Sequence, residues 1–147
     1  MNDELEFDHV TTEAAVATFT ESGPIFEGLL QEVRMLSKKK PEATMSEGKV
    51  KIVNRVLTDL LVILKDEPAG KYLDLLDDKT LPQVSDAVLT MVQFETALKA
   101  FRSRYRQRVE DQLYWITSEL LEEWNRQEED EDDEGGENEG GEEGGDR

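Results

Sequence analysis

Residues 85–127 read SDAVLTMVQFETALKAFRSRYRQRVEDQLYWITSELLEEWNRQ, a stretch without glycine or proline that decides the fold class. Large apolar side chains recur along it at three- and four-residue spacing, which is the period of one helix face. These side chains are Met91, Phe94, Leu98, Phe101, Tyr105, Val109, Leu113, Ile116, Leu120 and Trp124. The pattern predicts one long carboxyl-terminal helix over Ser85–Gln127.

A straight helix of that length would extend for about 60 Å at about 1.5 Å per residue, which is longer than a compact domain of this size needs. Two forms are therefore open. A bend between Ser103 and Gln107 would give a closed bundle. An unbroken helix would instead leave Val109–Trp124 protruding and available to a partner chain. We favour the bent form, because most helices of globular proteins have about 8–20 residues.

Four further helical segments are predicted upstream, over residues 12–20, 24–40, 50–64 and 72–76. Pro24 follows Ser22-Gly23 and should separate the first two, because proline suits the first turn of a helix and disrupts its interior. The third segment can be capped by Thr44, in a capping box with Glu47, or by Ser46. The expected fold is therefore an all-α bundle of four to five helices with one long carboxyl-terminal helix.

The last twenty residues have a different composition from the rest of the chain. Residues 128–147 contain twelve acids, one arginine, six glycines and no apolar side chain. Such a segment cannot bury enough hydrocarbon surface to offset the entropy lost on ordering it. We expect a helical domain over residues 1–127 and a disordered Glu/Asp/Gly-rich acidic tail over residues 128–147.

The charge of the chain indicates what kind of partner it can have. Of the net charge of −18, the tail contributes −11 from twelve acids and one base, and residues 1–127 contribute −7 from 23 acids and 16 bases. This balance argues against general affinity for nucleic acid or anionic lipid, because lysines and arginines supply most non-specific phosphate binding. We expect a protein partner, and a basic surface on that partner would suit the acidic tail. Homo- and hetero-oligomers are both compatible with the sequence.

Several classes of chemistry lack the residues that they require. The chain has no cysteine and one histidine, His9, so disulfides and thiolate zinc sites are excluded and paired zinc ligands are missing. It also has no glycine-rich phosphate loop and no nucleophile elbow. We expect a non-enzymatic protein without catalytic residues, cofactor or metal. His9 should be exposed to solvent.

The sequence also bears on where the protein works. Absence of cysteine fits a reducing compartment, and the acidic amino terminus does not resemble a signal peptide. The longest apolar run, Leu60–Leu64, is far shorter than the roughly 20 residues that a membrane span requires. We therefore expect a cytoplasmic protein that does not insert into membranes.

The end of the long helix carries the candidate partner-binding residues, which are Tyr114, Trp115, Leu121 and Trp124. Exposed tryptophan and tyrosine side chains are frequent anchors of protein interfaces. Trp115 lies off the apolar stripe, between Leu113 and Ile116, so one core cannot easily accept both tryptophans. The leading hypothesis is an accessory or adaptor subunit that docks a protein partner through this helix.

The segment Lys99–Arg108 holds five bases and no acid. Its candidate anion-binding residues are Arg102, Arg104, Arg106 and Arg108, since arginine makes two-pronged contacts with carboxylate and phosphate. We favour pairing with the chain's own acids, because Phe101 and Tyr105 fall on the apolar stripe and are not free to stack on bases. The alternative function is an electrostatic regulator, either an acidic decoy of a nucleic-acid-binding protein or a nucleic-acid binder restrained by its own tail.

Overall fold

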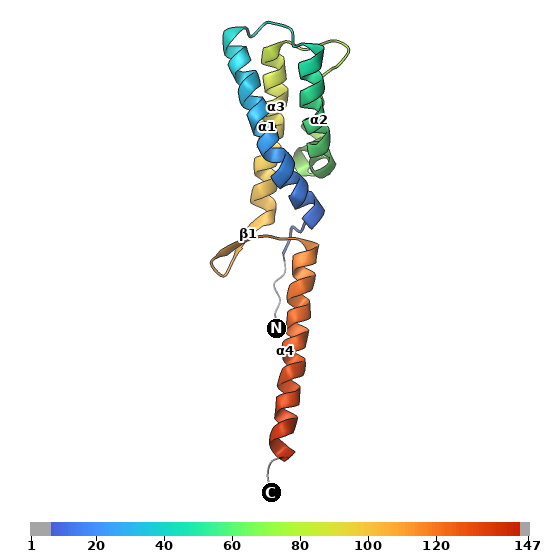
Figure 1. Ribbon diagram of the computed structural model, residues 1–147, viewed down its shortest axis with the longest axis vertical. Coiled ribbons are helices and arrows are strands. Elements are labelled where there is room, and N and C mark those ends of the chain that lie inside the picture. Colours follow the sequence, from blue (N-terminus) through green and yellow to red (C-terminus); the bar gives the residue numbers. More distant parts are fainter. Residues whose placement is uncertain (1–6, 145–147) are drawn as a thin grey trace.

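The computed structural model describes residues 7–144, with side chains described as far as Glu131. Three long helices, α1 (Glu13–Lys39), α2 (Glu47–Leu64) and α3 (Val84–Tyr105), pack into a bundle (Figure 1). The other elements are the 3-10 helix η1 (Pro68–Tyr72), strands β1 (Arg106–Val109) and β2 (Gln112–Trp115), and helix α4 (Ser118–Gly144). The fold is helical, as expected, but the small sheet means that it is not strictly all-α.

The core fills the space between α1, α2 and α3. Phe26 of α1 and Phe94 of α3 are both fully buried, with ring centroids 6.5 Å apart. From α2, the predicted apolar stripe contributes Val50, Val53, Val56, Leu57, Leu60 and Leu64, all of them buried. Burying one such side chain stabilises the fold by about 1.5–3 kcal/mol, so this shared core holds the three helices together.

Helix α1 is one continuous element with Pro24 in its interior. The expected division into two helices at Pro24 was therefore wrong. Proline has no N–H to donate to the carbonyl of Thr20, one turn earlier, and this local cost is what the prediction was based on. Three buried side chains that follow the proline, Phe26, Leu30 and Val33, anchor the helix to the core. Their packing outweighs the lost hydrogen bond.

Helix α2 confirms the helix predicted over residues 50–64 and begins three residues earlier, at Glu47. Its cap is Ser46, whose hydroxyl accepts a hydrogen bond from the Lys49 amide at 3.1 Å. Thr44, the other candidate for the cap, instead forms an isolated antiparallel bridge with Gln83. This bridge ties the α1–α2 loop to the start of α3.

The connector between α2 and α3 differs from the short helix predicted over residues 72–76. The helical turn comes earlier, as η1, and the chain beyond it is irregular. Asn54 of α2 holds this chain, because its Nδ2 donates to the Leu76 carbonyl and its Oδ1 accepts from the Leu76 amide, both at 2.9 Å. The Asn54 side chain thus supplies the hydrogen-bond partners that a helix or strand would have given to the Leu76 backbone.

A β-hairpin interrupts the long helix that the sequence predicted. Helix α3 ends at Tyr105, within the interval where a bend was expected, but the chain continues as the antiparallel pair β1–β2. The two turn residues, Glu110 and Asp111, have φ of 49° and 74°. Positive φ at both positions of a two-residue loop matches the twist of paired strands. The single helix over Ser85–Gln127 was therefore wrong.

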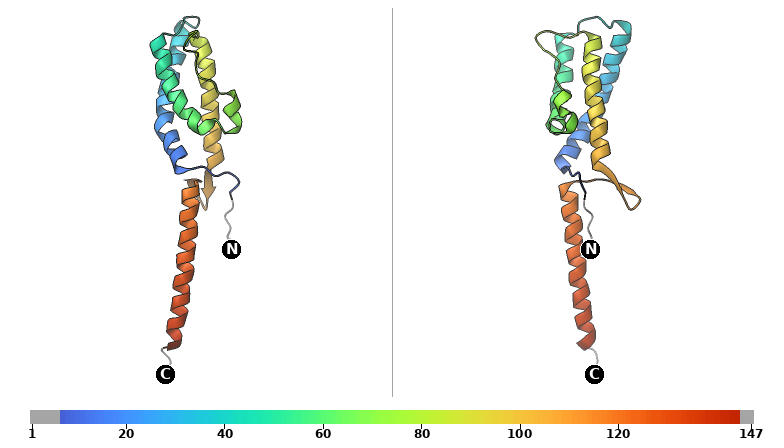
Figure 2. Two further views of the ribbon diagram at one scale, coloured as in Figure 1. Left: turned by 90° about the vertical axis from the view of Figure 1, so that its right-hand side faces the viewer. Right: turned by 180° about the vertical axis from the view of Figure 1, so that it is seen from behind.

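Helix α4 leaves the bundle at the end opposite the α1–α2 loop and points away from it (Figures 1 and 2). The Thr117 hydroxyl caps it by accepting a hydrogen bond from the Leu120 amide at 3.0 Å. Every side chain from Asn125 to Glu131 is exposed. No helix within the described residues has the length and apolar character to cross a membrane.

The helical backbone of α4 extends to Gly144 and so enters the segment whose composition predicts a disordered tail. A helix without tertiary packing is marginal in water, and each of its glycines disfavours it by about 1 kcal/mol. The expected disorder of this segment in solution stays a prediction. The last three residues of the predicted tail lie outside the described residues.

Candidate interaction site

Trp115 lies against the core and not on an outer helix face. Its ring meets Phe19 of α1 edge-on at 5.1 Å and lies 6.1 Å from the Phe101 ring of α3. The guanidinium of Arg106 covers the ring at 5.5 Å. Of the two tryptophans that the sequence suggested one core could not hold, Trp115 is the one that the core accepts.

The other three candidate partner-binding residues gather where the hairpin meets α4. Tyr114 of β2 and Trp124 of α4 pack edge to face, with ring centroids 5.2 Å apart and an interplanar angle of 87°. Leu121 lies three residues before Trp124 and therefore on the same side of the helix. All three side chains are only half-buried. We call Tyr114, Leu121 and Trp124 the hairpin–α4 surface.

The four candidate anion-binding arginines do not converge on one site. Arg104 forms an ion pair with Glu67 at 3.6 Å, and Arg106 covers Trp115. Arg108 donates to the carbonyl of Asp111 in the hairpin turn at 3.3 Å. Of these three arginines, Arg104 contacts an acid of its own chain, whereas Arg106 and Arg108 contact an aromatic ring and a backbone carbonyl.

Arg102, the fourth of these arginines, lines a hollow of about 450 Å³ between α1 and α3. The same hollow is lined by Glu27, Glu95 and Lys99, so its charges are mixed. Glu95 forms an ion pair with Arg34 at 3.2 Å. Partial burial, and then the negative charge of Glu95, raise the pKa of Glu27. Opposite charges already balance within this hollow, so it offers no concentrated site for an anion.

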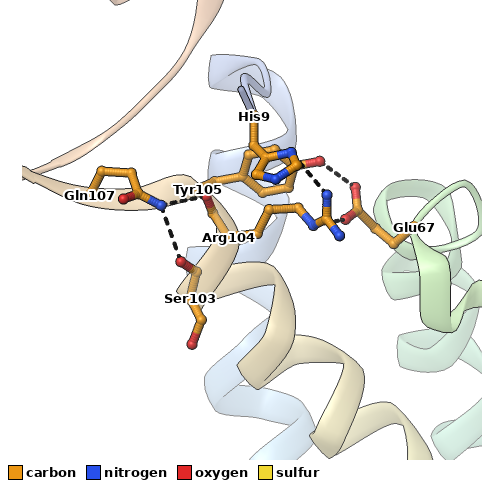
Figure 3. A network of polar contacts seen from close by, with 6 residues as sticks. All are labelled: His9, Glu67, Ser103, Arg104, Tyr105 and Gln107. Carbon is orange, nitrogen blue, oxygen red and sulfur yellow. Dashed lines mark hydrogen bonds and ion pairs between the residues drawn. The ribbon is translucent and has the colours of Figure 1, made fainter. Parts of the chain in front are cut away.

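A polar network joins the amino-terminal segment, the α2–η1 connection and the end of α3 (Figure 3). The Tyr105 hydroxyl donates to Glu67 Oε2 at 2.7 Å, and Arg104 Nη1 lies 2.9 Å from His9 Nδ1. His9 is exposed, as expected. In this pairing Nδ1 must accept the hydrogen bond, since arginine has no acceptor, so the geometry requires an imidazole without a proton on that nitrogen.

Burial, and then the hydrogen bond to Glu67, raise the pKa of Tyr105 to about 12. Because the folded value is above that of a free tyrosine, about 10, the stability linked to this phenol is complete below about pH 10. It is lost as the pH rises to about 12. We expect the tyrosinate absorbance of Tyr105 to appear near pH 12, and Glu67→Gln to move it lower. The matched Tyr105→Phe variant identifies the signal, and titration of Tyr105 near pH 10 would contradict the buried contact.

The start of α4 is bonded to the start of α1. The Thr11 amide donates to the Ile116 carbonyl and the Ser118 amide donates to the Thr11 carbonyl, both at 2.9 Å. Glu119 Oε1 accepts from the Glu13 amide at 3.0 Å. That hydrogen bond, followed by one from the backbone of Glu119 itself, lowers the pKa of Glu119. Sequence reasoning missed this junction, because its partners are distant in the chain.

A groove of about 360 Å³ lies between α1 and α2, near the loop that joins them. Its apolar lining comprises Leu29, Val33, Met35, Leu36, Ile52 and Val53. Lys39 of α1 and Lys49 of α2 also line it, together with Glu32. Met35 is 54 % exposed and Ile52 is 50 % exposed, so each helix presents a large apolar side chain to solvent. We call this hollow the α1–α2 groove.

Comparisons with known proteins do not assign the chain to a family. No family model matches it, and neither a curated protein nor a solved structure matches it. Among the described residues, no group of three or more His, Asp or Glu side chains is arranged to hold a metal ion.

Proposed function

We propose that this protein is a non-enzymatic accessory or adaptor subunit that docks a protein partner through the hairpin–α4 surface. The observation that supports the proposal is the edge-to-face pair of Tyr114 and Trp124, which is half-buried and lies outside the bundle core. Leu121 extends the apolar area on the same side of α4. Aromatic side chains held rigidly and left partly open are the usual anchors of protein interfaces.

The proposal differs from the sequence hypothesis in the role of one residue. Trp115 was expected to belong to the partner-binding set, but its contacts with Phe19 and Phe101 give it a structural role. We therefore propose Tyr114, Leu121 and Trp124 as the docking residues. The element that presents them is the hairpin together with the first turns of α4, in place of one long helix.

Trp124→Ala tests the docking surface. We expect the substitution to weaken capture of the partner from native lysate by tenfold or more, because truncating an interface anchor commonly costs about 2 kcal/mol or more. The fold should survive, because Trp124 lies outside the core. Quantitative pull-down with tagged full-length chains measures the effect.

The matched control is Leu89→Ala, which removes an apolar side chain that is 65 % exposed on α3. It should leave capture unchanged. Equal recovery of the same partner by the wild-type and Trp124→Ala proteins would refute the proposed docking surface.

The second candidate function is the electrostatic decoy, which the direction of α4 favours. The helix carries the exposed acids Glu128, Glu129, Asp130 and Glu131 away from the bundle. Removing residues 128–147 distinguishes the two functions, since an adaptor keeps its affinity for its partner whereas a decoy loses it. A nucleic-acid binder restrained by its tail would instead gain affinity for DNA or RNA, with a steep dependence on salt.

A further inference from the structure

Two unpartnered surfaces of the same molecule complement each other. We propose that the hairpin–α4 surface of one molecule docks into the α1–α2 groove of a second copy, so that molecules associate head to tail. This inference rests on the proposed function, because it names the partner of the surface proposed there. The apolar fit, the charges and the positions of the two surfaces in the fold each support it.

The apolar side chains of the groove suit a docked helix. Met35 and Ile52 stand on the two helices that border the groove, and both are at least half exposed. An amphipathic helix laid between two such helices buries its apolar stripe as a fourth member of the bundle. Leu121 and Trp124 of α4 form such a stripe, one turn of helix in length. Methionine adapts its shape readily, which helps the groove to accept an aromatic ring.

The charges beside these apolar residues are opposite in sign. Two bases, Lys39 and Lys49, and one acid, Glu32, line the groove, so its lining is net positive, and residues 34–55 as a whole contain seven bases and two acids. On α4, the exposed acids Glu122 and Glu123 lie between Leu121 and Trp124 in the sequence. Single exposed ion pairs contribute little affinity, but complementary sets of charges orient two proteins and disfavour other arrangements.

The fold prevents one molecule from satisfying both surfaces by itself. The groove lies near the α1–α2 loop, and α4 leaves the bundle at the opposite end and points away from that loop (Figures 1 and 2). The contact must therefore join two molecules. Because it pairs two different surfaces, it is heterologous, and the growing assembly keeps one free groove at one end and one free α4 surface at the other.

The uneven distribution of charge makes this orientation the favourable one. Two chains with a net charge of −18 repel each other in most orientations. Residues 34–55 carry a net charge of +5 from seven bases and two acids, whereas residues 128–147 carry −11 from twelve acids and one base. An arrangement that places the acidic helix of one molecule beside the basic α1–α2 end of the next brings opposite charges together.

Sedimentation velocity of the full chain at about 100 µM tests the proposal, since an interface of this kind is expected to bind with micromolar affinity. The wild-type protein should sediment as a mixture of monomer and larger species. The groove variant, Lys39→Glu with Lys49→Glu, and the α4 variant, Leu121→Ser with Trp124→Ser, should each remain monomeric. The matched control, Lys71→Glu with Lys79→Glu, makes the same charge change away from the groove and should associate like the wild type.

The decisive experiment mixes the two defective variants. In an equimolar mixture the groove of the α4 variant is intact, and so is the α4 of the groove variant, so a 1:1 heterodimer should form and grow no further. A monomeric wild-type protein, or a mixture that does not associate, would overturn the inference. The proposed function is judged separately, because Trp124→Ala would still abolish capture of a different partner if the second copy were the wrong one.

Discussion

Phe101→Ala is expected to lower the free energy of unfolding by about 3–5 kcal/mol, the largest effect of any single substitution considered for this protein. The Phe101 side chain is 1 % exposed and links three parts of the fold. Its ring stacks on Phe19 of α1 at 5.5 Å and packs against Tyr105 at 4.8 Å and Trp115 at 6.1 Å. Truncation leaves a cavity where the hairpin joins the bundle, so the packing of the hairpin and that of the bundle would weaken together.

Urea denaturation followed by circular dichroism and by tryptophan fluorescence measures this effect. Both signals should shift to lower urea by the same amount, because Trp115 reports on the same core that the helices share. Leu89→Ala on the same helix is the control and should change stability by no more than about 0.5 kcal/mol, since Leu89 is 65 % exposed. A loss below about 1 kcal/mol for Phe101→Ala would show that the aromatic cluster does not hold the hairpin.

Gly70→Ala is expected to cost about 2–3 kcal/mol through steric overlap. A Cβ atom on Gly70 would lie 2.6 Å from the Leu64 carbonyl oxygen and closer still to that of Lys65. Both obstacles are backbone atoms at the end of α2, so relief requires that η1 moves away from the helix. Such movement would also displace Glu67 from the Tyr105 hydroxyl, and the pKa of Tyr105 should fall toward its ordinary value.

Gly28→Ala provides the matched control, because it makes the same chemical change in open space. A Cβ on Gly28 meets no atom within 4 Å, and the residue lies inside α1. Alanine favours a helix over glycine by up to about 1 kcal/mol, so this variant should be more stable than the wild type. Thermal unfolding of the two variants side by side should give shifts of opposite sign; a stabilised Gly70→Ala protein would contradict the close packing of η1 on α2.

The parts of the fold that were predictable from sequence are those determined by local signals. Helix α2 has an apolar stripe and a serine cap at Ser46, one of the two caps that the sequence suggested, and its end at Leu64 was located correctly. The end of α3 at Tyr105 also fell inside the predicted interval. Pro24 shows the limit of such reasoning, because a local penalty was outweighed by the packing of Phe26 and other side chains that no local pattern can weigh.

The hairpin could not be separated from a helix by periodicity alone. Val109, Leu113 and Ile116 continue the helical spacing, and the turn at Glu110 and Asp111 lacks the glycine or asparagine that marks most two-residue hairpins. In a strand, neighbouring side chains point to opposite faces. The side chain of Tyr114 therefore packs on α4, whereas the side chain of Trp115 packs against the core.

The sequence suggests residue types for a docking site but not their arrangement. Tyr114 and Trp124 were proposed because exposed tyrosine and tryptophan side chains are frequent anchors of protein interfaces. The ion pair of Arg104 with Glu67 and the contact of Arg106 with Trp115 form only when the chain folds back to the end of α3. The lysines around the α1–α2 groove were visible as charges, whereas the groove itself exists only once two helices pack.

The bonding of Thr11 to Ile116 and Ser118 has a consequence for how the molecule is made. Glu13 and Glu119, which close the same junction, are 106 positions apart. Bringing such remote segments together is entropically slow, and contacts of this kind form late in folding. On the ribosome, α1 emerges long before residues 116–119 have been translated, so the start of α1 stays without these hydrogen bonds until that later segment appears.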